Sequence, residues 1–299
     1  MGAGKQLDWI ILFALVAVWG SAFAGLKIAA HEIAPAWIVA VRLVIGSALL
    51  VACAPLAGEK IPSFSNPAWR TYASIGVFGT AAPFFLFAWA SGRMDSTIVA
   101  ICNGASPFFT AALSAVMLRE TLGVRRIVGV ALGFGGLVLL ALPDAGAASA
   151  QAQTLGVLAG LLGAAGYAYA NVATKNAPPV GPITAAAMFS LVGAALAVPV
   201  ALATSPPPWS ASWPALTSVV ALGIGPSGFA SIGYIVLIRR RGPLFTAYST
   251  YLMPLWAAGV GILFLGERPG AEAALAMGLV LAGLAISSST ARPKITVSE

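Results

Sequence analysis

The sequence predicts an all-α membrane protein with ten transmembrane helices, arranged as two inverted five-helix repeats with both termini in the cytoplasm. Composition is the first observation that predicts this fold: 59% of the 299 residues are hydrophobic, 8% are charged, and the mean hydropathy is +0.93. A soluble domain has about 25% charged residues, so this chain has too few for a water-facing surface. The composition therefore excludes a soluble enzyme.

Apolar stretches bounded by proline, glycine or charge are the second observation. In order they cover residues 7–29, 35–56, 68–90, 96–118, 124–143, 154–175, 181–203, 213–238, 244–265 and 271–289. The first follows Lys5 as a secretory signal would, but it runs to residue 29, so we expect it to be retained as a span. The prolines after Ser205 separate the seventh stretch from the eighth, because they cannot be helical throughout. At about 20 residues per span, little chain remains for extramembrane domains.

An internal repeat is the third observation. Sliding the sequence along itself by 147 positions aligns Pro35 with Pro182, Gly46 with Gly193, Gly76 with Gly223, Ala100 with Ala247, Pro107 with Pro254, Glu120 with Glu267, and Gly136 with Gly283. The first span aligns at 148, which brings Trp19 onto Tyr167 and Lys27 onto Lys175. Residues 1–146 and 147–299 are thus predicted to be two copies of one unit. Five spans per copy invert the second copy in the membrane.

Basic residues predict the orientation, because cytoplasmic connections carry an excess of lysine and arginine. A cytoplasmic N-terminus places twelve of them inside: Lys5, Lys60, Arg70, Arg119, Arg125, Arg126, Lys175, Arg239, Arg240, Arg241, Arg292 and Lys294. Only Lys27, Arg93 and Arg268 fall outside, and Arg42 lies within the second span. The net charge of +7 is therefore interpreted as a topology signal, and no nucleic-acid partner is expected.

Two signatures point to a known family. The first span carries Trp19-Gly20-Ser21-Ala22-Phe23 with Lys27, and the pattern Pro-x12-Glu-x15-Gly occurs twice, beginning at Pro107 and at Pro254. With its ten predicted spans in two halves, the chain resembles an EamA-type member of the drug/metabolite transporter superfamily, and within it the bacterial aromatic amino acid exporters. The resemblance implies an exporter in the bacterial plasma (inner) membrane. Its central cavity would be lined mainly by the first, third, fourth, sixth, eighth and ninth spans.

Acidic residues are expected only in loops, tails and helix ends: Asp8, Glu32, Glu59, Asp95, Glu120, Asp144, Glu267, Glu272 and Glu299. A proton relay or a sodium site at mid-depth would need such a group, so we expect transport down the substrate's own gradient or by exchange. A single histidine and two cysteines inside apolar stretches predict no metal site. No cofactor and no catalysis are expected.

Aromatic and polar side chains on the cavity spans are the candidate substrate-binding residues. Trp19 and Phe23 share one helix face, as do Tyr167 and Asn171, since both pairs are spaced i, i+4. Aromatic faces can hold an ammonium and stack on an aromatic substrate. The other candidates are Phe84, Asn103, Tyr234, Tyr248 and Tyr251, with Trp89 as a further one. The alternative for each is core packing, lipid contact or, for Trp89, the interfacial belt.

Interrupted helices are the candidate hinges. Pro107 and Pro254 occupy matched positions, where a proline frees a backbone carbonyl for a ligand or for bending. A passive kink is the alternative. Pro83 and the run Gly225-Pro226-Ser227-Gly228 soften the third and eighth spans in the same way. Gly129 and Gly133 form a GxxxG pattern that indicates close helix packing.

Charged residues at special places have two interpretations each. Arg42 is either the anchor for a substrate carboxylate or a snorkelling side chain that pairs with a helix end. Glu120 and Glu267 either pair across a loop and lock one access state or cap helix ends.

The predicted function is export of small amphipathic metabolites, aromatic and other hydrophobic amino acids above all, by alternating access. Export of drugs or another metabolite is the alternative within transport, and a passive channel is a further one. The expected partners are a small-molecule substrate and the lipid bilayer. The oligomeric state stays open, and a monomer is compatible with the sequence.

Overall fold

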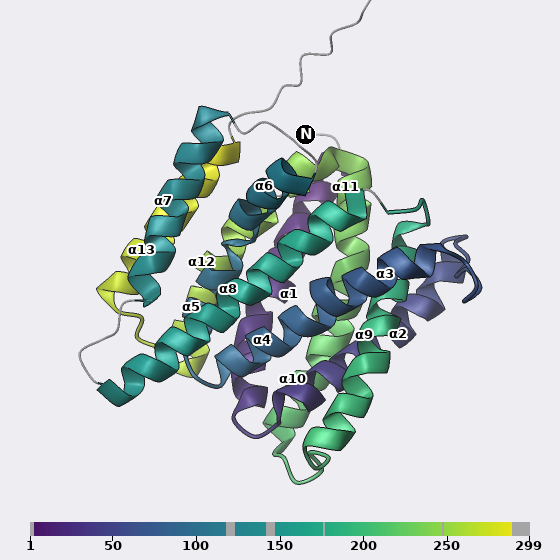
Figure 1. The fold of residues 1–299 in the computed structure, drawn as a ribbon, viewed down its shortest axis with the longest axis horizontal. Coiled ribbons are helices and arrows are strands. Elements are labelled where there is room, and N and C mark those ends of the chain that lie inside the picture. Colours follow the sequence, from purple (N-terminus) through teal and green to yellow (C-terminus); the bar gives the residue numbers. More distant parts are fainter. Residues whose placement is uncertain (1–2, 118–122, 142–146, 176, 247, 289–299) are drawn as a thin grey trace, which may run out of the picture.

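The computed structural model describes residues 3–117, 123–141, 147–175, 177–246 and 248–288 (Figure 1). Every regular element in these ranges is a helix. The first half contains α1 (Ala3–Ala30), α2 (Pro35–Leu56), α3 (Ala68–Gly76), η1 (Val77–Ala81), α4 (Ala82–Ser91), α5 (Ser96–Asn103), α6 (Ser106–Met117) and α7 (Val124–Ala141). The second contains α8 (Ala147–Lys175), α9 (Pro182–Thr204), α10 (Trp213–Leu222), η2 (Gly223–Phe229), α11 (Ala230–Thr246), α12 (Tyr248–Leu265) and α13 (Ala271–Ser288).

Seven helical segments of the described chain are long and apolar enough to cross a membrane. They are Gln6–Ala30, Pro35–Leu56, Ala68–Ser91, Ser96–Met117, Gln151–Thr174, Pro182–Thr204 and Trp213–Leu237. Shorter apolar helices cover Ile127–Gly136, Leu252–Leu265 and Ala271–Ile286. An all-helical membrane protein is therefore the observed class.

Two helices extend beyond the apolar spans predicted for them, whereas the apolar segments themselves, Gln151–Thr174 and Trp213–Leu237, agree with the predicted 154–175 and 213–238. α8 begins at Ala147 instead of 154, because the added residues are rich in alanine and glutamine, which favour helix without being apolar. α11 continues to Thr246 past the predicted end at 238, and the arginines at 239–241 favour the first part of this extension. The ninth span, predicted from 244, therefore begins only with α12 at Tyr248.

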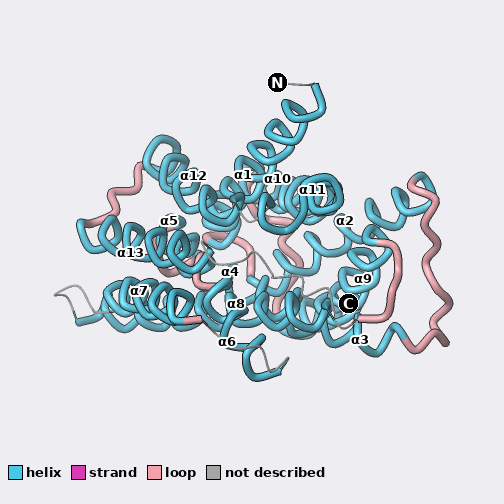
Figure 2. Tube along the Cα trace, turned by 90° about the horizontal axis from the view of Figure 1, so that it is seen from above, coloured by secondary structure: helices cyan, strands magenta, loops and turns pink. Residues whose placement is uncertain are grey.

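Close backbone approach brings α7 and α13 together at one side of the molecule, at the left in Figures 1 and 2. A Cβ at Gly283 would collide with the Gly129 carbonyl and the Gly133 backbone. A Cβ at Gly136 would collide with the Ala276 carbonyl. The close packing predicted from Gly129 and Gly133 is confirmed.

The central helices surround α1 and α8. α1 packs against α10, α11 and α12, and α8 packs against α3, α4 and α6, while α2 and α9 pack against each other. The largest buried cluster draws on α1, α2, α4, α5 and α8, and many of its members are alanines. Small residues let the backbones come close where lipid offers no hydrophobic driving force.

Candidate functional site

Four aromatic side chains from α1, α4 and α8 meet in the core. The Tyr167 ring stacks on Phe87, with centroids 5.5 Å apart and an angle of 30° between the planes. Tyr167 meets Phe84 edge-on at 6.2 Å, and Phe23 meets Phe87 edge-on at 6.4 Å. These are the favoured geometries of aromatic pairs. The structure thus brings together the predicted Phe23, Phe84 and Tyr167 with Phe87, which was not among the predicted site residues.

A second aromatic pair lies between α1 and α11. The centroids of Trp19 and Tyr234 are 5.4 Å apart, with 58° between the planes. The indole Nε1 of Trp19 donates to the carbonyl of Pro226 at 3.1 Å. That carbonyl belongs to η2, so α1 is tied to the irregular part of the eighth predicted span.

The two pairs occupy matching positions in the sequence. Tyr167 lies 148 positions after Trp19, and Tyr234 lies 147 positions after Phe87. Each pair joins the first predicted span of one half to the third predicted span of the other half. Trp19 of α1 meets Tyr234 of α11, and Tyr167 of α8 meets Phe87 of α4. The position of Tyr234 in the repeat was the signal that identifies Phe87.

Arg42 of α2 lies between the two aromatic groups. Its guanidinium carbon is 3.7 Å from the Phe84 ring centroid, and its Nε donates to the Ser227 hydroxyl at 2.7 Å. The residue is 7% exposed. Ser227 follows Pro226, so η2 contacts both Trp19 and Arg42. These contacts connect side chains of α1, α2, α4, α8, η2 and α11 in one continuous group. We call this group the central ring, and its members are Trp19, Phe23, Arg42, Phe84, Phe87, Tyr167, Ser227 and Tyr234.

Two π-helical segments lie at matching places beside this ring. η1 covers 77–81, and 147 positions later η2 covers 223–229. Such segments occur frequently at functional sites. Pro83 and Pro226 lack the N–H that would continue the ladder, and the third and eighth predicted spans are irregular at these places.

Glycines let each π-helical segment touch the second helix of the opposite half. A Cβ at Gly46 would come within 2.8 Å of the Ser227 Cβ and 3.4 Å of the Gly223 carbonyl. A Cβ at Gly193 would lie 3.7 Å from the Cβ of Ala81 in η1. α2 thus packs on η2, and α9 packs on η1.

The fourth predicted span is interrupted where α5 ends at Asn103 and α6 begins at Ser106. Pro107 is the second residue of α6 and has no N–H, so the Asn103 carbonyl lacks its usual i+4 donor. Asn103 is half-buried at this break. Pro254 is buried inside α12, which continues through it. Only the first of the two predicted hinges thus coincides with a break.

The remaining predicted residues lie elsewhere or outside the described part. Asn171 is exposed on α8, one turn beyond Tyr167, and its Nδ2 donates to the Thr110 hydroxyl at 3.3 Å. The backbone of Tyr248 and Tyr251 is helical, but their side chains lie outside the described residues. Asn171 is therefore not in the central ring.

A buried ion-pair cluster fastens the connection after α12 to the start of α5. Glu267 accepts the Ser96 N–H at 2.8 Å, the Thr97 N–H at 3.3 Å, the Thr97 hydroxyl at 2.9 Å and the Lys27 ammonium at 3.0 Å. Lys27 also donates to Asp95 at 2.6 Å. The pKa of Glu267 lies below its ordinary value: burial alone would raise it, but these hydrogen bonds outweigh burial. Glu267 thus caps a helix and pairs with a lysine.

The corresponding end of the second half has a different sequence. Asp95, Ser96 and Thr97 are matched by Gly242, Pro243 and Leu244. None of these side chains can replace the carboxylate or hydroxyl, and proline lacks the N–H. Glu120 lies outside the described residues.

Glu32 and Glu59 also hold the starts of helices. Glu32 accepts the Ser212 N–H at 2.7 Å and the Ser212 hydroxyl at 2.6 Å, just before α10, and these bonds lower the pKa of Glu32. Glu59 accepts the Thr184 N–H at 2.8 Å in the first turn of α9. Carboxylates are favoured there because the helix N-terminus carries partial positive charge.

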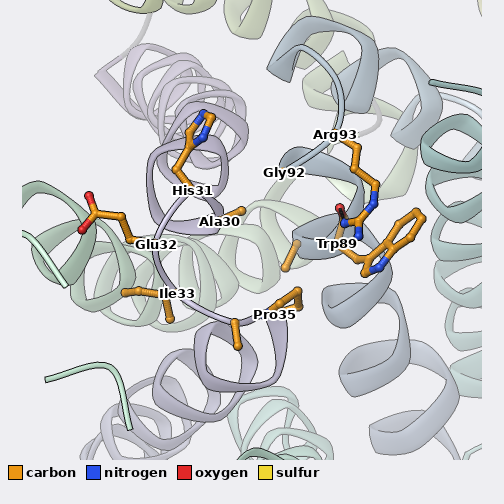
Figure 3. Close-up of a pocket in the computed structure, with 10 residues that line it drawn as sticks. Ala30, His31, Glu32, Ile33, Pro35, Trp89, Gly92 and Arg93 are labelled. Atoms are coloured by element: carbon orange, nitrogen blue, oxygen red, sulfur yellow. Dashed lines mark hydrogen bonds between the residues drawn. The ribbon is translucent and has the colours of Figure 1, made fainter. Parts of the chain in front are cut away.

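A cavity of about 460 Å³ lies apart from the central ring, between the α1–α2 connection and the end of α4 (Figure 3). Residues 30–35 line one side, and Ala88, Trp89, Gly92 and Arg93 line the other. The Arg93 guanidinium carbon is 3.6 Å from the Trp89 ring centroid, and its Nη1 donates to the Trp89 carbonyl at 2.9 Å. Trp89 thus lines this cavity and is not a member of the central ring.

Comparisons with known proteins point to one family of transporters. The model of the EamA-like transporter family matches residues 7–142 and again 154–289. A probable terminal-alkyne amino-acid exporter of Streptantibioticus cattleyicolor is 27% identical, over 92% of this chain and 91% of that protein. The aromatic amino acid exporter YddG of Ancylobacter novellus is 25% identical, over 95% and 97%. An uncharacterised transporter of Archaeoglobus fulgidus is 23% identical, over 93% and 97%.

A solved crystal structure has the same fold, with a TM-score of 0.67 over 94% of this chain and 96% of that chain, at 23% identity. The relatives are named as transporters or exporters, not as enzymes.

Proposed function

The chain belongs to the EamA-like transporter family, and we propose that it exports aromatic and other hydrophobic amino acids by alternating access. It is a multi-pass membrane protein and a transporter, so its partners are a small-molecule substrate and lipid. The proposal places it in a bacterial inner membrane, where the YedA transporter of Escherichia coli, 26% identical over 90% of this chain, is named as residing.

The observation that carries the substrate proposal is the central ring. It offers tilted and stacked aromatic rings from both halves, and aromatic faces can receive the aromatic side chain of a substrate. Two of the relatives are named as amino acid exporters. A small amphipathic molecule with one aromatic end fits this chemistry.

The proposed architecture is ten spans in two inverted repeats, residues 1–146 and 147–299, with both termini in the cytoplasm. Three observations support it. The family model matches the chain twice, with starts 147 positions apart. The members of the aromatic pairs recur after 147 or 148 positions, and η1 shifted by 147 positions falls within η2. Each π-helical segment contacts the second helix of the opposite half. Inverted repeats around a central site are typical of secondary transporters.

The proposed energy source is the substrate's own gradient or exchange. The described carboxylates with contacts in the structure hold helix starts or pair with basic residues, as Glu32, Glu59 and Glu267 do, and none is a partner of the central ring. A proton-driven relay would need a titrating group near the substrate.

The test is flux of radiolabelled phenylalanine in proteoliposomes, with and without a pH gradient and with unlabelled substrate inside. We expect saturable flux that internal substrate accelerates and a pH gradient leaves unchanged. Trp19→Ala and Tyr167→Ala should each reduce it, because the first removes the pair with Tyr234 and the second removes the pairs with Phe84 and Phe87. Flux without saturation or acceleration would indicate a passive channel. No flux of any aromatic amino acid in folded protein would redirect the proposal to a drug or another metabolite.

A further inference from the structure

Arg42 is a buried cation with most of its hydrogen-bonding capacity unused. The guanidinium has five N–H donors. In the described chain only its Nε–H has a partner, the Ser227 hydroxyl, while the Phe84 face supports the planar group from one side. Neither terminal nitrogen donates to a described residue. The residue is nevertheless 7% exposed.

In the described chain the fully buried side-chain polar atoms without a partner are Ser96 Oγ and Thr184 Oγ1, so the two terminal nitrogens of Arg42 are accessible to a ligand. A buried charge is stable only when it is paired and its donors are satisfied. The described partners of Arg42 are a hydroxyl and an aromatic ring, and neither carries a negative charge. Two parallel N–H groups of one guanidinium match the two oxygens of a carboxylate, which Arg binds bidentately.

We propose that Arg42 is the receptor for a substrate carboxylate, so that the site selects aromatic carboxylates and does not require an ammonium. This inference rests on the proposed function and narrows its substrate class. Aromatic acids without an amino group become substrates or competitors. Aromatic amines and amino acid amides bind more weakly, because they lack the carboxylate.

The neighbours of Arg42 explain why the carboxylate is the selected group. The guanidinium already occupies the Phe84 face, which is the nearest face able to attract a cation. An ammonium placed there would be repelled by Arg42 and would find no carboxylate among the described members of the central ring. The aromatic part of the substrate is left with Tyr167, whose ring meets Phe84 at 6.2 Å.

Ser227 is the positioning residue of this receptor. Its hydroxyl holds Nε, the nitrogen nearest the chain, and so leaves the two terminal nitrogens to the ligand. Ser227 belongs to η2, and a Cβ added at Gly46 would collide with the Ser227 side chain. Close packing of α2 on η2 therefore fixes the position of Ser227. The residue 147 positions after Arg42 is Phe189, which supplies no second receptor.

The first experiment uses the unaltered protein in proteoliposomes that carry labelled phenylalanine. Competitors are 3-phenylpropionate, which lacks the ammonium, phenylalaninamide, which lacks the carboxylate, and 2-phenylethylamine. We expect 3-phenylpropionate to compete within about tenfold of phenylalanine. The amide and the amine should be weaker by about 10- to 100-fold, the range for losing a charge-assisted hydrogen bond. Equal competition by the amide would overturn the inference while phenylalanine flux still upholds the proposed function.

The second experiment replaces the receptor. Arg42→Gln should raise the KM for phenylalanine about 10- to 100-fold and abolish the preference for phenylalanine over its amide. Arg42→Lys keeps the charge and should retain part of that preference. Arg70→Gln is the matched control, because it makes the same substitution at an exposed arginine of α3 that is not a member of the central ring. Unchanged discrimination in folded Arg42→Gln would refute the receptor.

The two proposals can fail separately. Transport of 3-phenylpropionate without transport of phenylalanine would reject the amino acid proposal and uphold the receptor. If Arg42→Gln does not fold, the competition series with the unaltered protein decides alone.

Discussion

Replacing Glu267 by glutamine is expected to destabilise the folded protein by about 2–4 kcal/mol. The Glu267 side chain is 1% exposed and accepts two backbone N–H groups, one hydroxyl and one ammonium. Glutamine keeps one acceptor oxygen but turns an NH2 group toward donors. Breaking a buried ion pair costs about 3–5 kcal/mol, and a hydrogen bond to a charged group contributes about 1.5–3 kcal/mol. The lower range applies because Lys27 keeps Asp95 as a partner at 2.6 Å.

Thermal unfolding in detergent measures this loss, and a melting temperature about 5–10 °C lower is expected at pH 7. Glu272→Gln is the control, because Glu272 is exposed at the start of α13. The pKa of Glu267 is lower in the folded protein than the ordinary 4.5. Its stabilisation is therefore complete above pH 4.5 and is lost as pH falls through the folded value. The deficit of the variant should be constant down to pH 4.5 and shrink below it. Equal melting temperatures at pH 7 would refute the reasoning.

Three further perturbations test other parts of the structure. Trp19→Phe keeps a ring but removes the bond to the Pro226 carbonyl, so it should cost about 1 kcal/mol of stability and reduce flux less than Trp19→Ala does. Gly223→Val should lower the melting temperature, since even a Cβ would lie 2.7 Å from that of Ile45, whereas Gly278→Ala, with nothing within 4 Å, should be neutral or slightly stabilising. In intact cells, a membrane-impermeant thiol reagent should label Ser210→Cys but not Ser65→Cys, both at exposed positions; the reverse pattern would reject the proposed orientation.

The membrane class and most helix positions could be predicted because hydrophobicity and helix coincide in lipid. Where they separate, at the start of α8 and the end of α11, the helix runs beyond the predicted apolar span. Trp19 and Tyr167 were named because they match under the repeat, and both lie in the central ring. The same rule leads from Tyr234 to Phe87, so that residue was within reach of the sequence.

Other contacts depend on geometry that no local pattern encodes. Tyr167 and Asn171 share a helix face by spacing, yet Tyr167 meets Phe87 of α4, whereas Asn171, one turn further along, meets Thr110 of α6. The partner of Arg42 is a serine 185 positions away, brought close by Gly46. Lys27, Asp95 and Glu267 likewise meet only after three separate segments have packed.

The length of each π-helical segment determines how the helix that follows it is rotated about its axis. A π-turn contains one residue more than the α-helix it replaces, and one residue corresponds to about 100° of rotation around the axis. The direction in which Tyr234 leaves α11 is thus determined by the length of η2 as well as by its own position. Deleting one residue from η2 would rotate every later side chain of α11 away from its present neighbours, although the identity of each of those side chains would be unchanged. Chain length at this place is therefore as much a part of the design as residue identity.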